Sequence, residues 1–171
     1  KIAFNTSTQD MFSLKKNLTN IQFNNIDTAN TTSMAHMIKG CKNLTNTDLS
    51  MFVTKQVDAM SGMFDGCNSF TSIDLSSFDT SNVKYMSSMF HNCINVTEIN
   101  VSSFNTAKVK NMGDMFNYCN KLETLDLSGF DTSSVTSMGY MFFHCTALKN
   151  LDVSRFKTSK VTTFVGMFAE D

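Results

Sequence analysis

The apolar residues of this chain recur at the same positions about every 26 residues. One methionine column comprises Met34, Met60, Met86, Met112 and Met138. A second methionine column and the five cysteines keep the same spacing, with the cysteines at Cys41, Cys67, Cys93, Cys119 and Cys145. A fixed period of this length indicates that one supersecondary unit is copied end to end. The pattern predicts a solenoid, whose function would belong to columns on its surface rather than to a pocket.

One stretch of each copy has the spacing of a helix. Apolar residues of one copy recur at intervals of three or four, at Val83, Met86, Met89, Phe90 and Cys93. This spacing lines one face of a helix of about two to three turns and predicts that the stretch packs inward. A threonine column stands just before the stripe, where a hydroxyl could cap the first helical turn, at Thr80, Thr106, Thr132 and Thr158.

A second stretch alternates between apolar and polar residues. Ile73, Asp74, Leu75 and Ser76 follow a period of two, and residues 125–128 repeat the pattern. That alternation predicts a strand of about three or four residues with one buried face. Equivalent strands of neighbouring copies would stack into a parallel ladder with a spacing of about 4.8 Å. Each copy is therefore interpreted as strand, turn, cap and helix.

No linker divides the copies, since the 171 residues include no proline and no glycine-rich spacer. A lone copy would not fold, because ordering costs about 1.5 kcal/mol per residue and one side of every apolar residue would stay wet. We therefore expect a single domain of about six rungs over residues 1–171. Its predicted parts are a degenerate capping copy at 1–33, regular copies at 34–59, 60–85, 86–111, 112–137 and 138–163, and a partial copy at 164–171.

Composition narrows the class of function. The chain carries 14 Lys and Arg against 15 Asp and Glu, a formal net charge of −1, with no run of either sign. A nucleic-acid surface needs a basic stripe, so we expect no nucleic-acid partner. Apolar stretches are only a few residues long, and we expect no membrane insertion by this segment. The start at Lys1 lacks the features of a signal peptide, and the stop at Asp171 favours a segment of a longer array over a helical cap.

The run from Leu125 to Cys145 resembles the repeat of the BspA-like leucine-rich-repeat bacterial surface proteins. Its two motifs, LDLSxFDTSxV and MxxMFxxC, stand at a fixed offset, and the resemblance extends over nearly the whole chain. It implies an α/β solenoid, a leucine-rich-repeat-like right-handed superhelix with one short parallel strand and one short helix per 26-residue repeat. It also implies a protein that is secreted or at the cell surface, in many cases a lipoprotein, with roles in adhesion. Phe130 stands where the general leucine-rich pattern has asparagine.

The cysteine column admits three interpretations. Disulfides are disfavoured because five is an odd number and because β-carbons one rung apart exceed the roughly 3.5–4.5 Å of a disulfide. A zinc site is disfavoured because a straight column of single thiols does not converge on one ion. We favour small thiols that fill one slot of a repeated core, and we likewise assign the methionines to the core. We expect no metal site.

No catalytic motif is present. GxGxxG, GxxxxGK and GxSxG runs do not occur, so nucleotide and esterase chemistry have no support. His36, His91 and His144 have no periodic acidic or thiol partner in the sequence, and we interpret them as solvated side chains. We therefore expect no enzyme and neither catalytic residues nor a cofactor.

The polar face of the predicted strands is the candidate binding surface. Alternation that turns Ile73 and Leu75 inward turns Asp74 outward, into an aspartate column whose like charges repel by about 0.8 kcal/mol per neighbour in water. Hydrogen bonds from the serine column or from turn amides would offset this repulsion, and so would a bound cation or basic protein segment. The candidate surface consists of Ser72, Asp74, Ser76, Glu98, Asn100, Ser102, Thr124, Asp126, Ser128, Asn150, Asp152 and Ser154.

The two columns that flank the aspartate and serine columns, one containing Ser72 and the other Ser77, vary from copy to copy, as a recognition surface requires and as a bare scaffold tolerates. Together with the resemblance, this favours an adhesin-like surface module that binds a protein or glycan of another cell or matrix. The alternative is a structural spacer or stalk of a larger surface protein with no ligand of its own. Binding of ice or of a mineral lattice by the threonine column is disfavoured, because these residues stand at cap positions.

Overall fold

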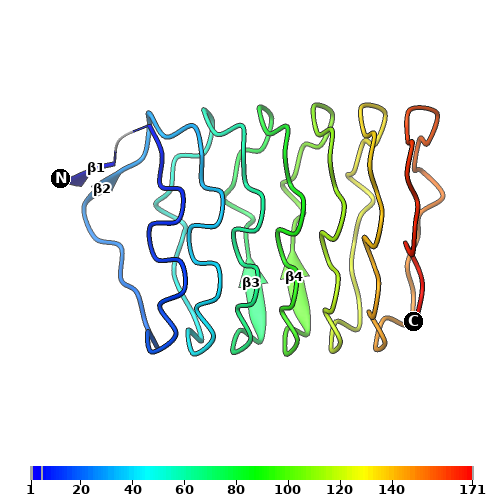
Figure 1. The fold of residues 1–171 in the computed structure, drawn as a ribbon. Coiled ribbons are helices and arrows are strands. Elements are labelled where there is room, and N and C mark those ends of the chain that lie inside the picture. Colours follow the sequence, from blue (N-terminus) through cyan, green and yellow to red (C-terminus); the bar gives the residue numbers. More distant parts are fainter. Residues whose placement is uncertain (1, 5, 171) are drawn as a thin grey trace.

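The chain winds into rungs that stack side by side along one axis, with the two ends of the chain at opposite ends of the stack (Figure 1). This computed structural model describes residues 2–4 and 6–170. Residues 26 apart lie in register, as Ile73 does with Ile99. The predicted repeat solenoid is confirmed. The outer limits drawn at Lys1 and Asp171 lie outside the described residues.

Regular strand structure is sparse and does not extend through every rung. Among the described residues the strands are β1 (Ile2–Ala3), β2 (Ile26–Asp27), β3 (Ser72–Asp74) and β4 (Glu98–Asn100). Strand β1 pairs in parallel with β2, and β3 with β4. The predicted strand at 73–76 is therefore present but begins one residue earlier and is shorter. Residues 125–128 form no strand, and the nearest pairing is a single bridge between Thr124 and Asn150.

The predicted helix is wrong, because none is found in the described parts of the chain. Residues 60–67 instead form consecutive tight turns, in the first of which the amide of Met63 donates to the carbonyl of Met60. The third residue of that turn, Gly62, has a φ of 59°. A positive φ at this place is what a type II turn requires and what a right-handed helix excludes.

The amides that do not form the turn hydrogen bonds donate along the stack to the next rung, instead of along a helix axis. Gly62 N donates to Ser87 O at 2.9 Å, and Phe64 N donates to Met89 O at 2.9 Å. Bonds that a helix would close within itself are thus formed between rungs. Each turn brings an apolar side chain back to the inside after three or four residues, so the apolar spacing resembles that of a helix.

A continuous ladder of parallel bridges runs along a face for which the sequence predicts no strand. Parallel bridges join one residue of every rung without interruption, at Ser7, Ser33, Ala59, Tyr85, Asn111, Ser137 and Thr163. In the regular copies this residue directly precedes the first methionine. On the strand face, by contrast, no bridge among the described residues joins 46–48 to 72–74, or 98–100 to 124–126.

Columns of identical side chains along the axis form the core. Phe64, Phe90, Phe116 and Phe142 are at most 1% exposed, and their ring centroids are 5.5–5.7 Å apart with nearly parallel planes. The two methionine columns are buried beside them. Assignment of this stripe to the core from its spacing was therefore correct, although the backbone beneath it is not helical.

All five cysteines are buried, and none of them is in a disulfide. The Cys93 thiol donates to the carbonyl of Phe64 at 3.2 Å, and the Cys119 thiol donates to that of Phe90 at 3.2 Å. Burial and the neighbouring thiol of Cys119 raise the pKa of Cys93, so that this thiol stays protonated. The interpretation of small thiols filling one slot of the core agrees with this arrangement.

The threonine column clamps each rung to the next. Oγ1 of Thr80 accepts a hydrogen bond from the amide of Asn105 at 2.8 Å and donates to the carbonyl of Asn105 at 3.0 Å. The same pair of bonds forms at Thr28, Thr54, Thr106 and Thr132. The predicted helix caps are therefore wrong: the hydroxyl does bind an amide, but one that lies 25 residues ahead on the next rung.

Candidate functional site

The strand face presents the predicted binding residues to solvent. In β3, Ser72 and Asp74 are exposed on either side of buried Ile73, and in β4 Glu98 is exposed and Asn100 partly so. Exposed as well are Ser76, Ser102, Thr124, Asp126, Ser128, Asn150, Asp152 and Ser154. Stacking of the rungs gathers these side chains on one face, and their role in binding stays a prediction.

Each aspartate of this face is held by the serine two residues ahead. Oδ1 of Asp74 accepts hydrogen bonds from the amide of Ser76 and from Nδ2 of Asn100, both at 3.0 Å. The same amide bond, at 2.8–2.9 Å, forms at Asp48, Asp126 and Asp152. The amide and hydroxyl of Ser76 lower the pKa of Asp74, so the carboxylate is ionised at neutral pH. Repulsion along the column is thus offset within the chain, by the turn amides.

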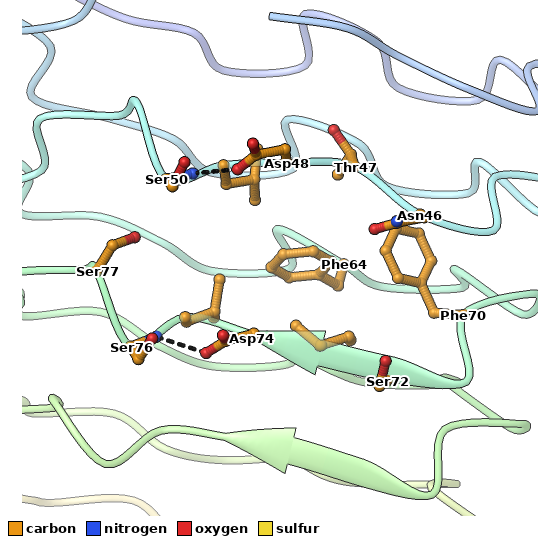
Figure 2. A pocket seen from close by; sticks show the side chains of 13 residues that line it. Asn46, Thr47, Asp48, Ser50, Phe64, Phe70, Ser72, Asp74, Ser76 and Ser77 are labelled. Atoms are coloured by element: carbon orange, nitrogen blue, oxygen red, sulfur yellow. Dashed lines mark hydrogen bonds between the residues drawn. The ribbon is translucent and has the colours of Figure 1, made fainter.

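A hollow of about 320 Å³ opens where the strand face lacks pairing, between residues 46–50 and 72–77. Figure 2 shows Asp48 and Asp74 on its two sides, each bonded to its serine, with the ring of Phe64 between them. The lining residues include these two carboxylates and no Lys or Arg. A smaller hollow, about 200 Å³, lies at the second interruption, between residues 98–102 and 124–126. The face is therefore negative and indented rather than flat.

The described residues form neither a cluster that could hold a metal ion nor a helix that could span a membrane. Of the residues that the structure describes, no three His, Cys, Asp or Glu side chains gather into a group that could hold a metal ion. Nor does this part of the chain contain a helix long and apolar enough to cross a bilayer.

The histidines lie beside acidic residues of neighbouring rungs. Nδ1 of His91 is 2.9 Å from Oδ1 of Asp65, whose Oδ2 lies 2.9 Å from Nζ of Lys39. The other two pairs are His36 with Asp10 and His144 with Glu170. The interpretation of partnerless, solvated histidines is therefore wrong. Partners 26 residues away in sequence become neighbours only when the rungs stack, and counting residues in multiples of the period would have found them.

Asp65 is expected to make stability depend on pH. Burial acts to raise the pKa of this carboxyl, but hydrogen bonds and charges from His91 and Lys39 outweigh it and lower the pKa. A pKa that is lower in the folded state contributes stability above the unfolded value of about 3.9, and this stability is lost as the pH falls. Asp65→Asn should therefore cost about 1 kcal/mol of unfolding free energy near neutral pH.

Thermal unfolding of wild type and Asp65→Asn across the acid range measures this effect. The two melting temperatures should converge as the pH drops below about 4 and the wild-type carboxylate becomes protonated. The control is Asp58→Asn, which removes an exposed pair with Lys84 at 3.2 Å and should change little. A gap between wild type and Asp65→Asn that is the same at every pH would show that Asp65 acts by packing instead.

Comparison with known proteins adds the family and the fold. The profile of a family described as "Mycoplasma protein of unknown function, DUF285" matches residues 6–99 and again 94–171. A leucine-rich repeat protein from Bacteroides ovatus is 13% identical, with a TM-score of 0.52 over 94% of this chain and 45% of that one. The T. pallidum leucine-rich repeat protein is 15% identical, with a TM-score of 0.46 over 87% of this chain and 72% of that one. No curated protein matches.

The likeness to the Bacteroides ovatus protein supports a leucine-rich-repeat solenoid as the fold. This chain spans less than half of that protein's length, 45%. At such low identity the likeness concerns the course of the backbone and leaves the surface side chains to be considered by themselves.

Proposed function

The chain belongs to the DUF285 family of BspA-like leucine-rich repeats, and from this premise we propose that it is a non-enzymatic binding module of the cell surface. Its strand face recognises a protein or glycan of another cell or of the surrounding matrix, in an adhesin-like role. Leucine-rich repeat solenoids suit such a role because they offer long, rigid surfaces whose exposed residues vary while the core repeats.

The hollow between Asp48 and Asp74 is the observation that carries the proposal. Both carboxylates are ionised, because serine hydrogen bonds lower the pKa of each, and they lie on neighbouring rungs. A basic segment of a partner protein fits this surface best, since Lys or Arg would supply the positive charge that the hollow lacks. Complementary charge would also speed the encounter at low salt.

A spacer with no ligand remains the second candidate, and a specific observation favours it. Each aspartate of the face already accepts a hydrogen bond from its own turn, so the column needs no partner to be stable. A spacer would present the same repeated columns and bind nothing.

A binding screen separates the two. The chain is immobilised and exposed to purified extracellular-matrix proteins and to intact cells. The bound partner is then tested against Ser72→Arg, which places a bulky positive charge at the rim of the hollow. We expect this variant to weaken binding at least about tenfold, which corresponds to about 1.4 kcal/mol. Raising the salt concentration should weaken wild-type binding as well.

Ala107→Arg is the matched control, because it adds the same side chain at an exposed position outside the strand face. It should leave binding unchanged. Equal binding by Ser72→Arg and wild type would place recognition elsewhere, whereas a screen with no bound partner would leave the spacer as the function.

A further inference from the structure

We call the face built by the tight turns of each rung, at residues 60–67 and their equivalents, the turn face. It carries a group of nine side chains that departs from the repeat pattern. Three positions from each of three consecutive rungs form what we call the turn-face grid. Backbone hydrogen bonds hold its rungs side by side, as from Asn92 N to Asn117 O at 2.8 Å and from Tyr118 N to Phe143 O at 2.9 Å. The grid consists of Ser88, His91, Asn92, Asp114, Asn117, Tyr118, Tyr140, Phe143 and His144.

One half of the grid is a rigid aromatic platform. The ring of Tyr118 stacks on that of His144, with centroids 4.6 Å apart and planes 19° from parallel. Phe143 meets His144 edge-on at 4.6 Å and Tyr140 edge-on at 5.5 Å. Rings that already hold one another lose little conformational freedom when a ligand binds, which preserves binding free energy.

This platform is not required by the fold. The equivalent residues of an earlier rung are Gly62, Asp65 and Gly66, and the solenoid continues through that rung although these three positions carry no ring. Tyr140 is 41% exposed, and its ring lies over Gly166 of the next rung rather than in the core.

Three of the aromatic residues also stand where the backbone favours glycine. The φ angles of Tyr118, Tyr140 and His144 are 59°, 55° and 57°. A side chain in this left-handed region costs roughly 1 kcal/mol relative to glycine. The equivalent turn positions of other rungs also have a positive φ, as at His36 and Asp114, so this geometry belongs to the fold and only the choice of aromatic residues is particular to the grid.

The other half of the grid is polar and carries no positive charge from Lys or Arg. Nδ2 of Asn117 donates to Oδ1 of Asp114 at 2.7 Å, which orients the carboxylate. The amide of Asp114 donates to the carbonyl of Gly139 at 2.9 Å, so Asp114 lies on the rung next to that of Tyr140. Asn92 lies with its Nδ2 3.2 Å from a ring nitrogen of His91. Carboxylate and amide groups form hydrogen bonds with hydroxyls, and the lone carboxylate repels anions.

We propose that the turn-face grid binds a neutral pyranose of a carbohydrate. The apolar C–H face of the sugar lies on the exposed ring of Tyr140 beside Phe143, and its hydroxyls donate to the carboxylate of Asp114. Aromatic rings with polar neighbours suit such a ligand, because a sugar has one apolar face and a polar edge. Acidic sugars are rejected, since the grid offers Asp114 and no Lys or Arg. The inference rests on the proposed role as a binding module but not on the strand face.

Calorimetric titration with neutral oligosaccharides tests the proposal. The probes are the hexasaccharides of β-1,4-linked glucose, N-acetylglucosamine, mannose and xylose, with polygalacturonate as the acidic comparison. We expect at least one neutral probe to bind, with a Kd of about 1 mM or tighter, and polygalacturonate not to bind. Tyr140→Ala and Phe143→Ala should each weaken that binding at least about tenfold.

Two controls separate this site from the strand face. Tyr85→Ala removes a ring that is 46% exposed but lies outside the grid, and it should leave sugar affinity unchanged. Ser72→Arg should also bind sugar normally, even if it abolishes capture of a matrix protein. Melting curves establish that each variant is folded, and Tyr140→Ala suffices if Phe143→Ala is not.

Three outcomes would overturn the proposal. The first is that none of the neutral probes binds the wild-type chain. The second is that Tyr140→Ala binds sugar as well as wild type does, or that Ser72→Arg abolishes sugar binding, which would move the glycan site to the strand face. The third is that Tyr140→Ala loses a matrix protein but no sugar, which would make the grid a protein contact.

Discussion

Replacement of Phe90 by alanine is expected to lower the free energy of unfolding by about 3–5 kcal/mol. Phe90 is fully buried, and its ring lies between those of Phe64 and Phe116, with centroids 5.7 and 5.5 Å away. Removing the ring leaves a cavity in the middle of the column and takes contacts away from both neighbours. Repacking is limited because each rung is held in register by hydrogen bonds on its other sides. Urea denaturation measures the loss, and the melting temperature should fall by about 10 °C.

Phe168→Ala is the matched control in the same column. Phe168 stacks on Phe142 at 5.6 Å, but it is 50% exposed and no ring covers its other face among the described residues. Its removal should cost about 1 kcal/mol, in proportion to the apolar surface that is buried. Equal losses from the two substitutions would show that the column does not act as a continuous core.

Thr80→Val should lower the unfolding free energy by about 2–4 kcal/mol, although the two side chains have nearly the same shape. Thr80 is 1% exposed, and its hydroxyl satisfies both the amide and the carbonyl of Asn105. Valine would leave the amide and the carbonyl of Asn105 without their partner beside a buried side chain, and an unpaired group that water cannot reach costs about 1–3 kcal/mol. Chemical denaturation of the purified variant measures this directly.

Two further variants identify the cause. Thr80→Ser keeps the hydroxyl and should recover most of the stability that valine loses. Thr158→Val changes the same column at a rung where the side chain is exposed, and it should be nearly neutral. A loss at Thr158 as large as that at Thr80 would argue that the threonines act through local backbone preference and not by clamping rungs together.

The candidate site was only partly predictable. Alternation around Ile73 correctly placed Ser72 and Asp74 on the outside, because side chains of an extended segment alternate whatever its length. The hollow beside them was not predictable, since it depends on where pairing between rungs fails. The turn-face grid is not predictable for another reason: its positions fall in the stretch whose apolar spacing predicts a helix, and ring contacts such as that of Tyr118 with His144 join residues 26 apart.

The sequence by itself determined that this protein is a solenoid, which residues lie over one another, and which form its core. A strict period leaves little choice, because the identical apolar residues of each copy are buried only when the copies stack in register. Tertiary structure alone decided how the backbone closes each rung. Turns with a positive φ and a helix both return an apolar side chain inward every three or four residues, and the choice between them rests on hydrogen bonds to the next rung, as from Gly62 to Ser87. Those bonds join groups 25 residues apart, so no local pattern of side chains could show them.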